Sequence, residues 1–392
     1  MITVSAAKKL ISDSTVALDP EVLDLENASG HILADDIYAQ YDIPAFKQSS
    51  MDGYALKFED REKKLLLVGE MAAGTETSIA IKGGETSRIF TGAPLPEGAD
   101  TVVMQEKIRV ESGDINIDDP DLKLGSNVRD KGAEIRAGKL AMHSGNLLTP
   151  AAIGFLAGIG IHKVNVFPMP KVSIVVTGKE LQQPGLQLGF GQVYESNSYS
   201  LSAALKAEGI ADVIIFQADD DLDMLVSVLE KAMATADVVL LTGGVSVGDY
   251  DFVIEASKRC GVQQVFHKVR QKPGKPLYFG KKDRKIVFGL PGNPSSVLSC
   301  YYNYVLPCLK LLSKKEDRVI EVTAELAHSY KKAAGLTHFL KGIYASGKVS
   351  LLTAQESFRL SSFAQANCLI CMDEEKMEFA AGESVQVLLL PS

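Results

Sequence analysis

The spacing of hydrophobic and polar positions changes along the chain. Near the N-terminus, apolar residues recur at helical spacing from Val4 to Ile11, which predicts an amphipathic helix. From His31 to about Leu140, short apolar runs alternate with Gly, Pro and Asp turns. These runs are LLLVGEMA, SRIF, TVVMQE and INI. Because short runs bounded by turn residues are typical of strands, this part of the sequence predicts a compact all-β unit.

A second helix is predicted in TPAAIGFLAGIG, residues 149–160. Thr149 suits the N-cap position, and Pro150 suits the first helical position, where a missing N–H leaves no hydrogen bond unmade. We expect this helix to pack against the N-terminal helix. That contact would close an insertion that contains the β unit.

Residues 171–312 have the alternating pattern of an α/β domain. The near-continuous apolar runs VSIVVTG, DVIIFQ, DVVLLTGG and KIVFGLPG predict strands that are buried on both faces. Helices are predicted between them at 197–208, 220–235 and 250–260. This alternation implies a parallel sheet with right-handed crossovers. Residues 318–390 return to strand-like alternation in VIEVTAEL, HFLKGIY and VQVLLL, which predicts a small final β domain.

Composition narrows the class of protein. The 392-residue chain is 46% apolar and 23% charged, which suits a globular protein of two to four domains. Its 41 basic and 49 acidic residues give a net charge of −8, which argues against a nucleic-acid-binding protein. An anionic ligand would therefore need local lysines, arginines or a metal. Neither a signal-peptide core nor a membrane-length apolar run is apparent, so we expect a cytoplasmic protein with no membrane partner.

The five cysteines are odd in number and form no disulfide framework, which indicates a reducing compartment. Cys368 and Cys371 have CxxC spacing, but they lie in the apolar run NCLICM without a second pair. Buried strand thiols are the favoured interpretation, and a zinc or redox role is the alternative. The six histidines are scattered, and we expect none of them to bind metal.

The stretch LTGGVSVGDYD, residues 241–251, places a glycine turn directly after a predicted strand. Gly243, Gly244 and Gly248 would let the backbone approach a ligand closely. Ligands of doubly wound sheets bind beyond the carboxyl ends of strands, where this turn is expected. The stretch matches neither common phosphate loop. Val245 replaces a glycine of GxGxxG, and acids follow the last glycine where a P-loop has lysine and a hydroxyl.

The acids of this turn are Asp249 and Asp251. Carboxylates repel phosphate unless a cation intervenes, and Mg²⁺ is usually held by one or two carboxylates together with substrate phosphates. The turn therefore predicts a metal-assisted phosphate site. The structural alternative is that Asp249 caps the following helix and that Asp251 interacts with the dipole of that helix.

A second strand-end turn is GLPGNPSS, residues 289–296. Asn293 is expected at the N-cap, Pro294 at the first helical position, and Ser295 and Ser296 supply hydroxyl groups. A capped helix start explains these residues structurally. The functional indication is that two glycine turns follow neighbouring strands of one sheet.

The stretch QKPGKP, residues 271–276, lies between these turns in the sequence and holds Lys272 and Lys275 in a proline-stiffened turn. The structural alternative is a solvated basic turn. In an acidic protein, however, lysines next to two phosphate-type turns favour an anion site.

Three further acids occur at turns. Glu180 follows the strand end VVTG, Asp220 lies among Asp219 to Asp221 where a strand meets a helix, and Asp52 lies in SSMDGYA. Each is weak by itself, because an acid in a turn usually only stabilises the turn.

Together these stretches resemble the molybdopterin molybdenumtransferases, the MoeA family, which is related to the E domain of gephyrin. The matching stretches are PAFKQSSMDGYA, IFTGAPLPEGADTVVMQE, NVRDKGAEIRAG, VVTGKEL, GQVYESN, LTGGVSVGDYD, KPGKP and GLPGNPSS. They are ordered along the chain, and the resemblance covers essentially all of it.

The resemblance implies a multidomain α/β plus β protein that forms a homodimer of elongated subunits. An N-terminal stalk would comprise residues 1–43 and 139–168, and a β-rich inserted domain residues 44–138. A doubly wound α/β domain of the molybdopterin-binding type would comprise residues 169–314, and a C-terminal β barrel residues 315–392. The active site would lie between the α/β domain of one subunit and the β-rich domain of the other.

The resemblance also implies a reaction. The family converts adenylylated molybdopterin and molybdate, with Mg²⁺, into molybdenum cofactor and AMP. The implied catalytic residues are Asp52, Thr91, Glu134, Glu180, Asp220 and Asp251. Of these, Glu180, Asp220 and Asp251 would hold the metal. The implied substrate-binding residues are Gly243, Gly244, Ser246, Gly248, Asp249, Lys268, Lys272, Lys275, Pro276, Gly292, Asn293, Ser295, Lys341 and Ser362.

Several positions depart from the family pattern. Glu134 stands where the family usually has aspartate, and Lys179 replaces an acid next to Glu180. In GLTHFLKG, Leu336 and Lys341 stand where the family tends to have arginine. Lys341 keeps the charge but loses the bidentate fork of arginine. We therefore expect this protein to differ from its relatives in molybdate affinity.

Two other functions stay open at this point. A molybdopterin adenylyltransferase resembles the α/β domain alone, but it lacks the β-rich first half and the C-terminal domain. A gephyrin-like scaffold without enzymatic activity is the second alternative. Further partners suggested by the resemblance are the upstream adenylyltransferase and the acceptor molybdoenzymes.

Overall fold

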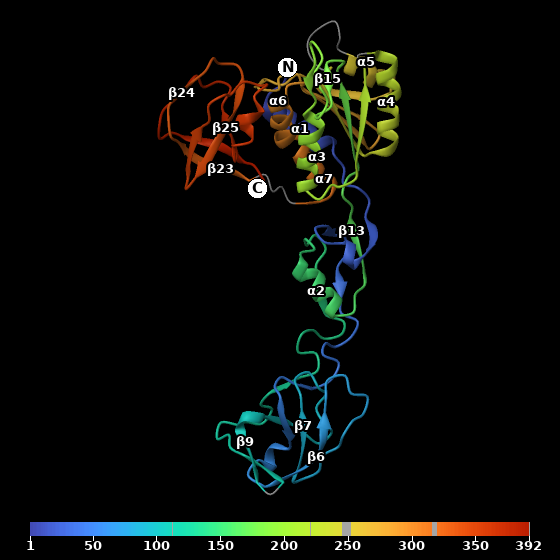
Figure 1. Ribbon diagram of the computed structural model, residues 1–392, viewed down its shortest axis with the longest axis vertical. Coiled ribbons are helices and arrows are strands. Elements are labelled where there is room, and N and C mark those ends of the chain that lie inside the picture. Colours follow the sequence, from blue (N-terminus) through green and yellow to red (C-terminus); the bar gives the residue numbers. More distant parts are fainter. Residues whose placement is uncertain (112, 220, 245–251, 316–319, 392) are drawn as a thin grey trace. The chain divides into compact units, whose positions relative to one another are not determined.

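The computed structural model describes residues 1–111, 113–219, 221–244, 252–315 and 320–391 (Figure 1). Two compact units are present. Unit 1 comprises Met1–Glu21, Gly30–Ile32 and Asn165–Ser392, and unit 2 comprises Val22–Ser29 and Leu33–Val164. The four-domain division suggested by the sequence is finer than these two units and stays a prediction.

Unit 2 contains a six-stranded sheet of order β8-β5-β7-β6-β10-β9. Its strands are β5 Gly53–Leu56, β6 Leu65–Met71, β7 Glu85–Ile89, β8 Thr101–Met104, β9 Ile108–Glu111 and β10 Asp114–Ile117. The runs LLLVGEMA, SRIF, TVVMQE and INI form β6, β7, β8 and β10, which confirms the β prediction. Successive side chains point to opposite faces. Accordingly, Ala55 and Val102 belong to one core cluster, and Leu56 and Val103 to another.

Short elements complete this region. They are β1 Glu21–Asp24, η1 Leu25–Asn27, β2 Ile32–Leu33, β3 Ile37–Tyr38, β4 Gln48–Ser49, η2 Phe58–Asp60, η3 Gln105–Lys107, β11 Val128–Arg129, β12 Leu140–Met142, α2 Pro150–Gly158 and β13 Lys163–Phe167. Strands β1, β13 and β2 form a three-stranded sheet, while β11 pairs with β4 and β12 pairs with β3. The predicted cap of α2 is confirmed, because the Thr149 side chain accepts a hydrogen bond from the Ala152 N–H.

The α/β part of unit 1 has a six-stranded sheet of order β17-β14-β18-β22-β21-β19. Its strands are β14 Val172–Thr177, β17 Val213–Ala218, β18 Val238–Thr242, β19 Gln263–His267, β21 Tyr278–Lys282 and β22 Lys285–Leu290. The predicted strands are β14, β17, β18 and β22, and they are parallel. Strands β21 and β19 extend the sheet as an antiparallel edge that the sequence analysis missed. Mixed sheets with such an edge are common.

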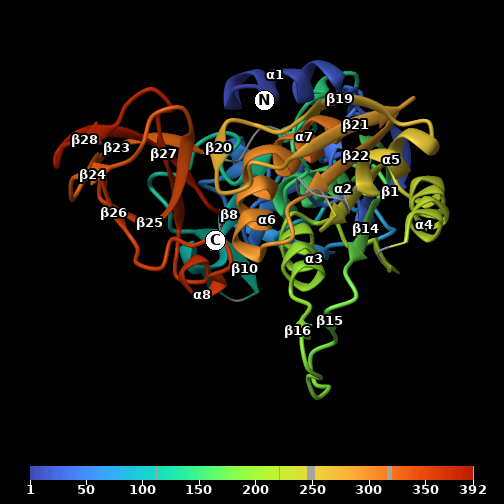
Figure 2. The ribbon, with the colours of Figure 1, turned by 90° about the horizontal axis from the view of Figure 1, so that it is seen from above.

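Helices cover both faces of this sheet. They are α1 Val4–Ser14, α3 Asn197–Ala207, α4 Leu222–Thr235, α5 Phe252–Arg259, α6 Pro294–Cys300 and α7 Leu306–Leu312, with the π-helical turn η4 Tyr301–Val305 between the last two. Ile174 of β14 joins the core cluster that contains residues of α3, α6 and α7, whereas Val175 joins the cluster that contains residues of α4 and α5. Near Glu180, the arm formed by β15 Leu181–Gln182, β16 Val193–Tyr194 and their loop projects from the sheet (Figure 2).

The helix at the N-terminus is present, but its expected partner was wrong. We expected it to pack against the helix at 149–160. Instead Ala7 and Ile11 of α1 belong to the core of unit 1, where α1 contacts α7 and η4. Helix α2 lies in unit 2 and contacts η1. Helical periodicity shows which face is buried, but not which element buries it.

The C-terminal domain of unit 1 is a closed five-stranded barrel. Its elements, with the short strand that joins it to the α/β part, are β20 Gln271–Lys272, β23 Glu321–Leu326, β24 Tyr330–Lys331, β25 Thr337–Ala345, β26 Lys348–Leu351, α8 Leu360–Phe363, β27 Cys368–Met372, β28 Glu378–Phe379 and β29 Ser384–Leu389. The order β25-β26-β23-β29-β27 closes because β25 also pairs with β27. Strand β20 pairs with β25 in parallel, so the lysine-bearing segment is hydrogen-bonded to the barrel. Cys368 and Cys371 lie on β27 as free thiols.

Candidate functional site

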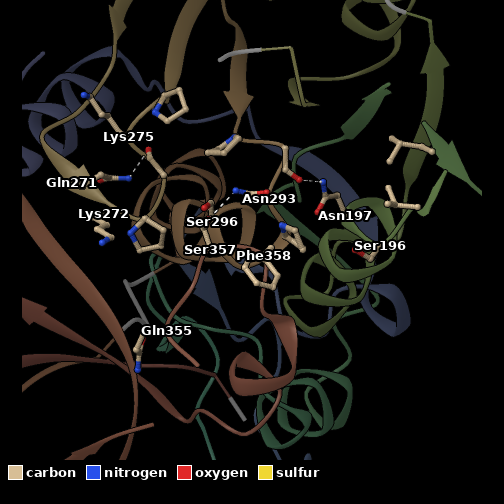
Figure 3. A pocket seen from close by; sticks show the side chains of 18 of the residues that line it. Ser196, Asn197, Gln271, Lys272, Lys275, Asn293, Ser296, Gln355, Ser357 and Phe358 are labelled. Carbon is tan, nitrogen blue, oxygen red and sulfur yellow. Dashed lines mark hydrogen bonds between the residues drawn. The ribbon is translucent and has the colours of Figure 1, made fainter. Parts of the chain in front are cut away.

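A cleft of about 790 Å³ lies in unit 1 at the carboxyl ends of the parallel strands (Figure 3). One wall follows β14 and reaches the start of α3, another is the loop 271–276, and a third is the turn between β22 and α6. The barrel adds Leu336, Gln355, Ser357 and Phe358. The polar lining residues are Glu180, Tyr194, Ser196, Asn197, Gln271, Lys272, Lys275, Asn293, Ser296, Gln355 and Ser357.

The two glycine turns predicted to adjoin each other do so. The Gly243 N–H donates a 3.2 Å hydrogen bond to the Leu290 carbonyl at the end of β22. A Cβ on Gly292 would lie 3.8 Å from the Cα of Gly243. Gly243 has a φ of 90°, and a Cβ there would meet the Thr177 hydroxyl at 2.8 Å. Only glycine therefore fits this position.

The other predicted residues of this edge lie outside the described residues. They are Asp220, Ser246, Gly248, Asp249 and Asp251. Of the three predicted metal ligands, Glu180 alone lies within the described residues. Its exposed carboxylate lies over Gly178, where a Cβ would meet one carboxylate oxygen at 2.7 Å. Within the described residues, no three His, Cys, Asp or Glu side chains are grouped as metal ligands.

The loop 271–276, called the lysine loop because it carries Lys272 and Lys275, is stabilised by the buried side-chain amide of Gln271. Lys272 and Lys275 are exposed and line the cleft. Gln271 is 1% exposed, and its amide nitrogen donates a 3.0 Å hydrogen bond to the Gly274 carbonyl. The hydroxyl of Tyr304 donates to the amide oxygen of Gln271. Because Tyr304 belongs to the π-helical turn η4, the irregular helix turn places this donor under the loop.

Space around this loop is tight. A Cβ on Gly274 would meet the Cys300 sulfur at 2.5 Å, and Gly274 has a φ of 82°. Pro276 lines the cleft. Lys268 is half-buried with a φ of 71°, and its backbone N–H donates to the Leu277 carbonyl. It is not part of the described cleft lining.

Asn293 occupies the predicted N-cap position, but its side chain makes no cap hydrogen bond. Its amide nitrogen donates a 2.8 Å hydrogen bond to the hydroxyl of Ser357 in the barrel. The Ser295 N–H donates to the Ser357 carbonyl at 3.1 Å. Ser295 is buried, and among the described residues its hydroxyl has no hydrogen-bond partner. The barrel loop thus accepts a hydrogen bond from one of the N–H groups that have no partner within the first turn of this helix.

The same barrel loop depends on Lys341 and Ser362. The buried Lys341 ammonium donates to the carbonyls of Ala354, Glu356 and Arg359 at 2.9, 3.4 and 3.1 Å. Burial lowers the pKa of Lys341. The Ser362 hydroxyl donates to the Ala354 carbonyl at 2.7 Å. Both predicted substrate-binding residues therefore shape the loop that brings Gln355, Ser357 and Phe358 to the cleft, and their direct contact with substrate stays a prediction.

In unit 2, the structure brings Asp52 and Thr91 together. The backbone N–H and the hydroxyl of Thr91 both donate to the same Asp52 carboxylate oxygen, each at 2.8 Å. These two bonds, the backbone one first, lower the pKa of Asp52. Glu134 is exposed, and its backbone N–H donates to the Ile43 carbonyl.

Several lining residues were not identified from the sequence as site residues. They are Asn197, Gln271, Gln355, Ser357 and Phe358. Asn197 lies in GQVYESN and Gln271 precedes KPGKP, so their neighbourhoods were noted although their roles were not. The barrel residues lie in QESF, residues 355–358, a stretch that carries no glycine or proline signal.

Comparison with known families identifies the class of the α/β domain first. Residues 173–311 match the family described as a probable molybdopterin binding domain. Residues 2–160 match the MoeA N-terminal region, domains I and II, and residues 323–390 match the MoeA C-terminal region, domain IV.

Whole-length relatives agree with these matches. A molybdopterin molybdenumtransferase from Haemophilus influenzae is 32% identical, with 99% of this chain and 98% of the relative covered. One from Nostoc sp. is 35% identical over 95% of this chain and 89% of the relative. A crystal structure of a molybdopterin biosynthesis MoeA protein from Pyrococcus horikosii has a TM-score of 0.83 at 30% identity, with 99% of each chain covered. The chain therefore belongs to the molybdopterin molybdenumtransferase (MoeA) family. Among the described residues, none of the helices is both long and apolar enough to span a membrane.

Proposed function

We propose that this chain acts as a molybdopterin molybdenumtransferase in molybdenum-cofactor synthesis. Its substrates would be adenylylated molybdopterin and molybdate, it would require Mg²⁺, and it would release AMP and molybdenum cofactor. The observation that carries the proposal is the cleft, in which Lys272 and Lys275 share one cavity with Glu180 and with the turn at Gly292.

The charges of the cleft suit this reaction. Cleavage of a pyrophosphate linkage depends mainly on positioning and charge neutralisation. The chain has a net charge of −8, so an anionic substrate needs a local source of positive charge. Lys272 and Lys275 supply it, and a lysine ammonium is a compact charge suited to a tetrahedral oxyanion.

Glu180 fits a magnesium ligand, because Mg²⁺ takes oxygen ligands and is usually held by one or two carboxylates plus substrate phosphates. Asp220 and Asp251 would complete the protein's share of the ligands. When bound, the ion would neutralise charge on the phosphate oxygens. Lys179, next to Glu180, is exposed and adds positive charge at this edge.

We propose no covalent enzyme intermediate. The described cleft lining contains no cysteine and no histidine. Three serines line it: Ser296 is buried, the hydroxyl of Ser357 accepts the hydrogen bond from Asn293, and the half-buried Ser196 has no histidine in the lining to act as its base. Trapping of a phosphorylated or adenylylated enzyme would contradict this part of the proposal.

We further propose a homodimer in which Asp52, Thr91 and Glu134 of one subunit serve the reaction of the other. The hydrogen-bonded Asp52–Thr91 pair supports a shared role for these two residues. Mixing Asp52→Ala subunits with Lys272→Ala subunits tests this arrangement. Partial recovery of activity in the mixture is expected, and an inactive mixture of exchanging subunits would contradict it.

The reaction itself is tested by AMP release from adenylylated molybdopterin, measured with and without molybdate in the presence of Mg²⁺. Molybdate-dependent release is expected. A parallel assay with ATP and molybdopterin tests the adenylyltransferase alternative, and adenylylated product there would replace the proposal. Formation of neither product would favour a scaffold.

Variants connect the result to the cleft. Lys272→Ala should raise the KM for molybdate roughly tenfold or more, because a charge-assisted hydrogen bond contributes about 1.5–3 kcal/mol. Lys348→Ala, which removes an exposed lysine on β26, is the matched control and should leave the KM unchanged.

A further inference from the structure

Asn197 lines the cleft, and only one of the two polar atoms of its side-chain amide has a hydrogen-bond partner among the described residues. It is the first residue of α3 and is 8% exposed. Its amide nitrogen donates a 2.8 Å hydrogen bond to the Gly292 carbonyl. Its amide oxygen is buried and has no hydrogen-bond partner among the described residues. The side chain lines the cleft and lies across it from Lys272 and Lys275 (Figure 3).

The hydrogen bond to Gly292 identifies the nitrogen and the oxygen of the Asn197 side-chain amide. A carbonyl accepts only from an N–H, so the nitrogen of Asn197 must face Gly292 and the oxygen must face away from it. A buried acceptor without a partner costs about 1–3 kcal/mol. Buried polar groups usually have a partner, and this acceptor lines a cleft that would hold a ligand.

Apolar side chains line the cleft close to Asn197 in the chain, next to polar ones such as Ser196. Leu181, Val193 and Tyr194 line the same part of the cleft, and Leu181 lies opposite Val193 in the pairing of β15 with β16. Val193 is 51% exposed and Tyr194 is 48% exposed, so both can contact a ligand. Apolar and aromatic surface together with an unpaired acceptor suits a flat heterocycle that carries an N–H donor.

We propose that the amide oxygen of Asn197 accepts a hydrogen bond from the amino group of a fused nitrogen heterocycle, and that it thereby selects amino-bearing rings over deaminated ones. The inference rests on the proposed function and deepens it. It assigns the heterocycle to the part of the cleft beside the β15–β16 arm and the anionic centre to the part beside Lys272 and Lys275. The amino group is common to adenine and pterin, and the experiment distinguishes these two sources.

The test is ligand binding to the full-length protein, measured by isothermal titration calorimetry. One pair of ligands is AMP and purine riboside monophosphate, which has hydrogen in place of the amino group. The other pair is 6-hydroxymethylpterin and its analogue with hydrogen in place of the 2-amino group. The wild-type protein should prefer the amino ligand of one pair roughly tenfold or more, as expected for a lost hydrogen bond to a buried acceptor.

Asn197→Leu should abolish that preference, so that the two ligands of the pair bind with about equal affinity. Asn293→Leu is the matched control, since the amide of Asn293 already bonds Ser357. It should weaken both ligands of a pair alike and keep their ratio. Loss of preference in the AMP pair assigns the acceptor to adenine, and loss in the pterin pair assigns it to pterin.

Three results would overturn the inference. They are an absence of preference in the wild-type protein, a preference that persists in Asn197→Leu, and an absence of measurable binding of both amino ligands. The first and third results are measured on the wild-type protein. The inference can therefore be overturned even if Asn197→Leu does not fold. Because the experiment measures binding and not turnover, its failure leaves molybdate-dependent AMP release, the test of the proposed function, unaffected.

Discussion

The amide nitrogen of Asn293 donates a 2.8 Å hydrogen bond to the hydroxyl of Ser357, 64 residues later in the chain. This bond joins the turn after β22 to a loop of the C-terminal barrel. The loop also places the Ser357 carbonyl on the Ser295 N–H. One wall of the cleft is therefore completed by the barrel, which explains why the α/β domain alone would present a different site.

We expect Asn293 and Ser357 to be energetically coupled. Asn293→Ala and Ser357→Ala should each lower stability modestly, and the double variant should lose about 0.5–1.5 kcal/mol less than the sum of the single losses. Urea denaturation of the four proteins measures this coupling. Ser361→Ala, at an exposed serine of α8, serves as the control. Strict additivity would show that the bond is not formed in solution.

Tyr304 should control the lysine loop without touching substrate. Tyr304→Phe removes the donor to the buried Gln271 amide oxygen and leaves that acceptor unsatisfied, at a cost of about 1–3 kcal/mol. We expect the KM for molybdate to rise several-fold with a smaller change in kcat, because Lys272 and Lys275 lose their fixed position. Steady-state kinetics at varied molybdate concentration measures the two constants.

Tyr302→Phe is the matched control for this variant. Tyr302 belongs to the same π-helical turn, and its ring, which stacks on Phe363, is retained in phenylalanine. It should leave the KM for molybdate unchanged. If Tyr304→Phe lowers stability but leaves this KM unchanged, then Tyr304 supports the fold and not the loop.

Lys341 should act on the cleft through the barrel loop. Lys341→Met leaves the carbonyls of Ala354, Glu356 and Arg359 without their shared donor. We expect a loss of about 1–3 kcal/mol in stability, together with faster hydrogen exchange in residues 354–359. Exchange measured by mass spectrometry tests the second effect. Lys331→Met removes an exposed ion pair with Glu378 and should cost less than about 1 kcal/mol. Equal exchange rates in the wild-type protein and Lys341→Met would contradict the assigned role.

His338 should make the barrel sensitive to acid. Burial, with smaller contributions from Lys332 and Lys272, lowers the pKa of His338 to about 4. Its Nδ1 lies 3.0 Å from the Tyr330 hydroxyl. Burial raises the pKa of Tyr330, so Tyr330 remains protonated and donates to the neutral imidazole.

The sign of the pH dependence follows from this lowered pKa. Above about pH 6.5 the imidazole is neutral in the folded and the unfolded chain, and His338 contributes no pH dependence. Between pH 6.5 and 4, only the unfolded chain takes up the proton, so the free energy of unfolding falls, by up to roughly 3 kcal/mol. Below about pH 4 both states are protonated and the contribution is constant. His338→Asn should remove this slope, and the control His328→Asn, at an exposed histidine, should keep it. NMR titration of the imidazole measures the pKa directly, and a value near 6.5 would refute the prediction.

The sequence predicted regular elements and their grouping well. Long apolar runs such as VSIVVTG were identified as parallel strands, because strands covered on both faces have no polar side. The adjacency of Gly243 and Gly292 was also predictable, since the carboxyl ends of β18 and β22 meet at one sheet edge. The antiparallel strands β21 and β19 were missed. Polar and charged residues interrupt both sequences, which hides the apolar pattern, and β19 is the edge strand of the sheet, where such residues are common.

By itself, then, the sequence determined most of the helices and the parallel strands, where the glycine turns lie, and which acids and lysines are candidates for an anion site. These properties depend on local periodicity and on the conformational freedom of single residues. Only the tertiary structure decided that Ser357 bonds Asn293, that Tyr304 supports Gln271, and that the amide oxygen of Asn197 is left without a partner. Such contacts join polar side chains that are distant in sequence. Their geometry is set by how the sheet, the π-helical turn and the barrel pack together, and no local pattern of residues encodes it.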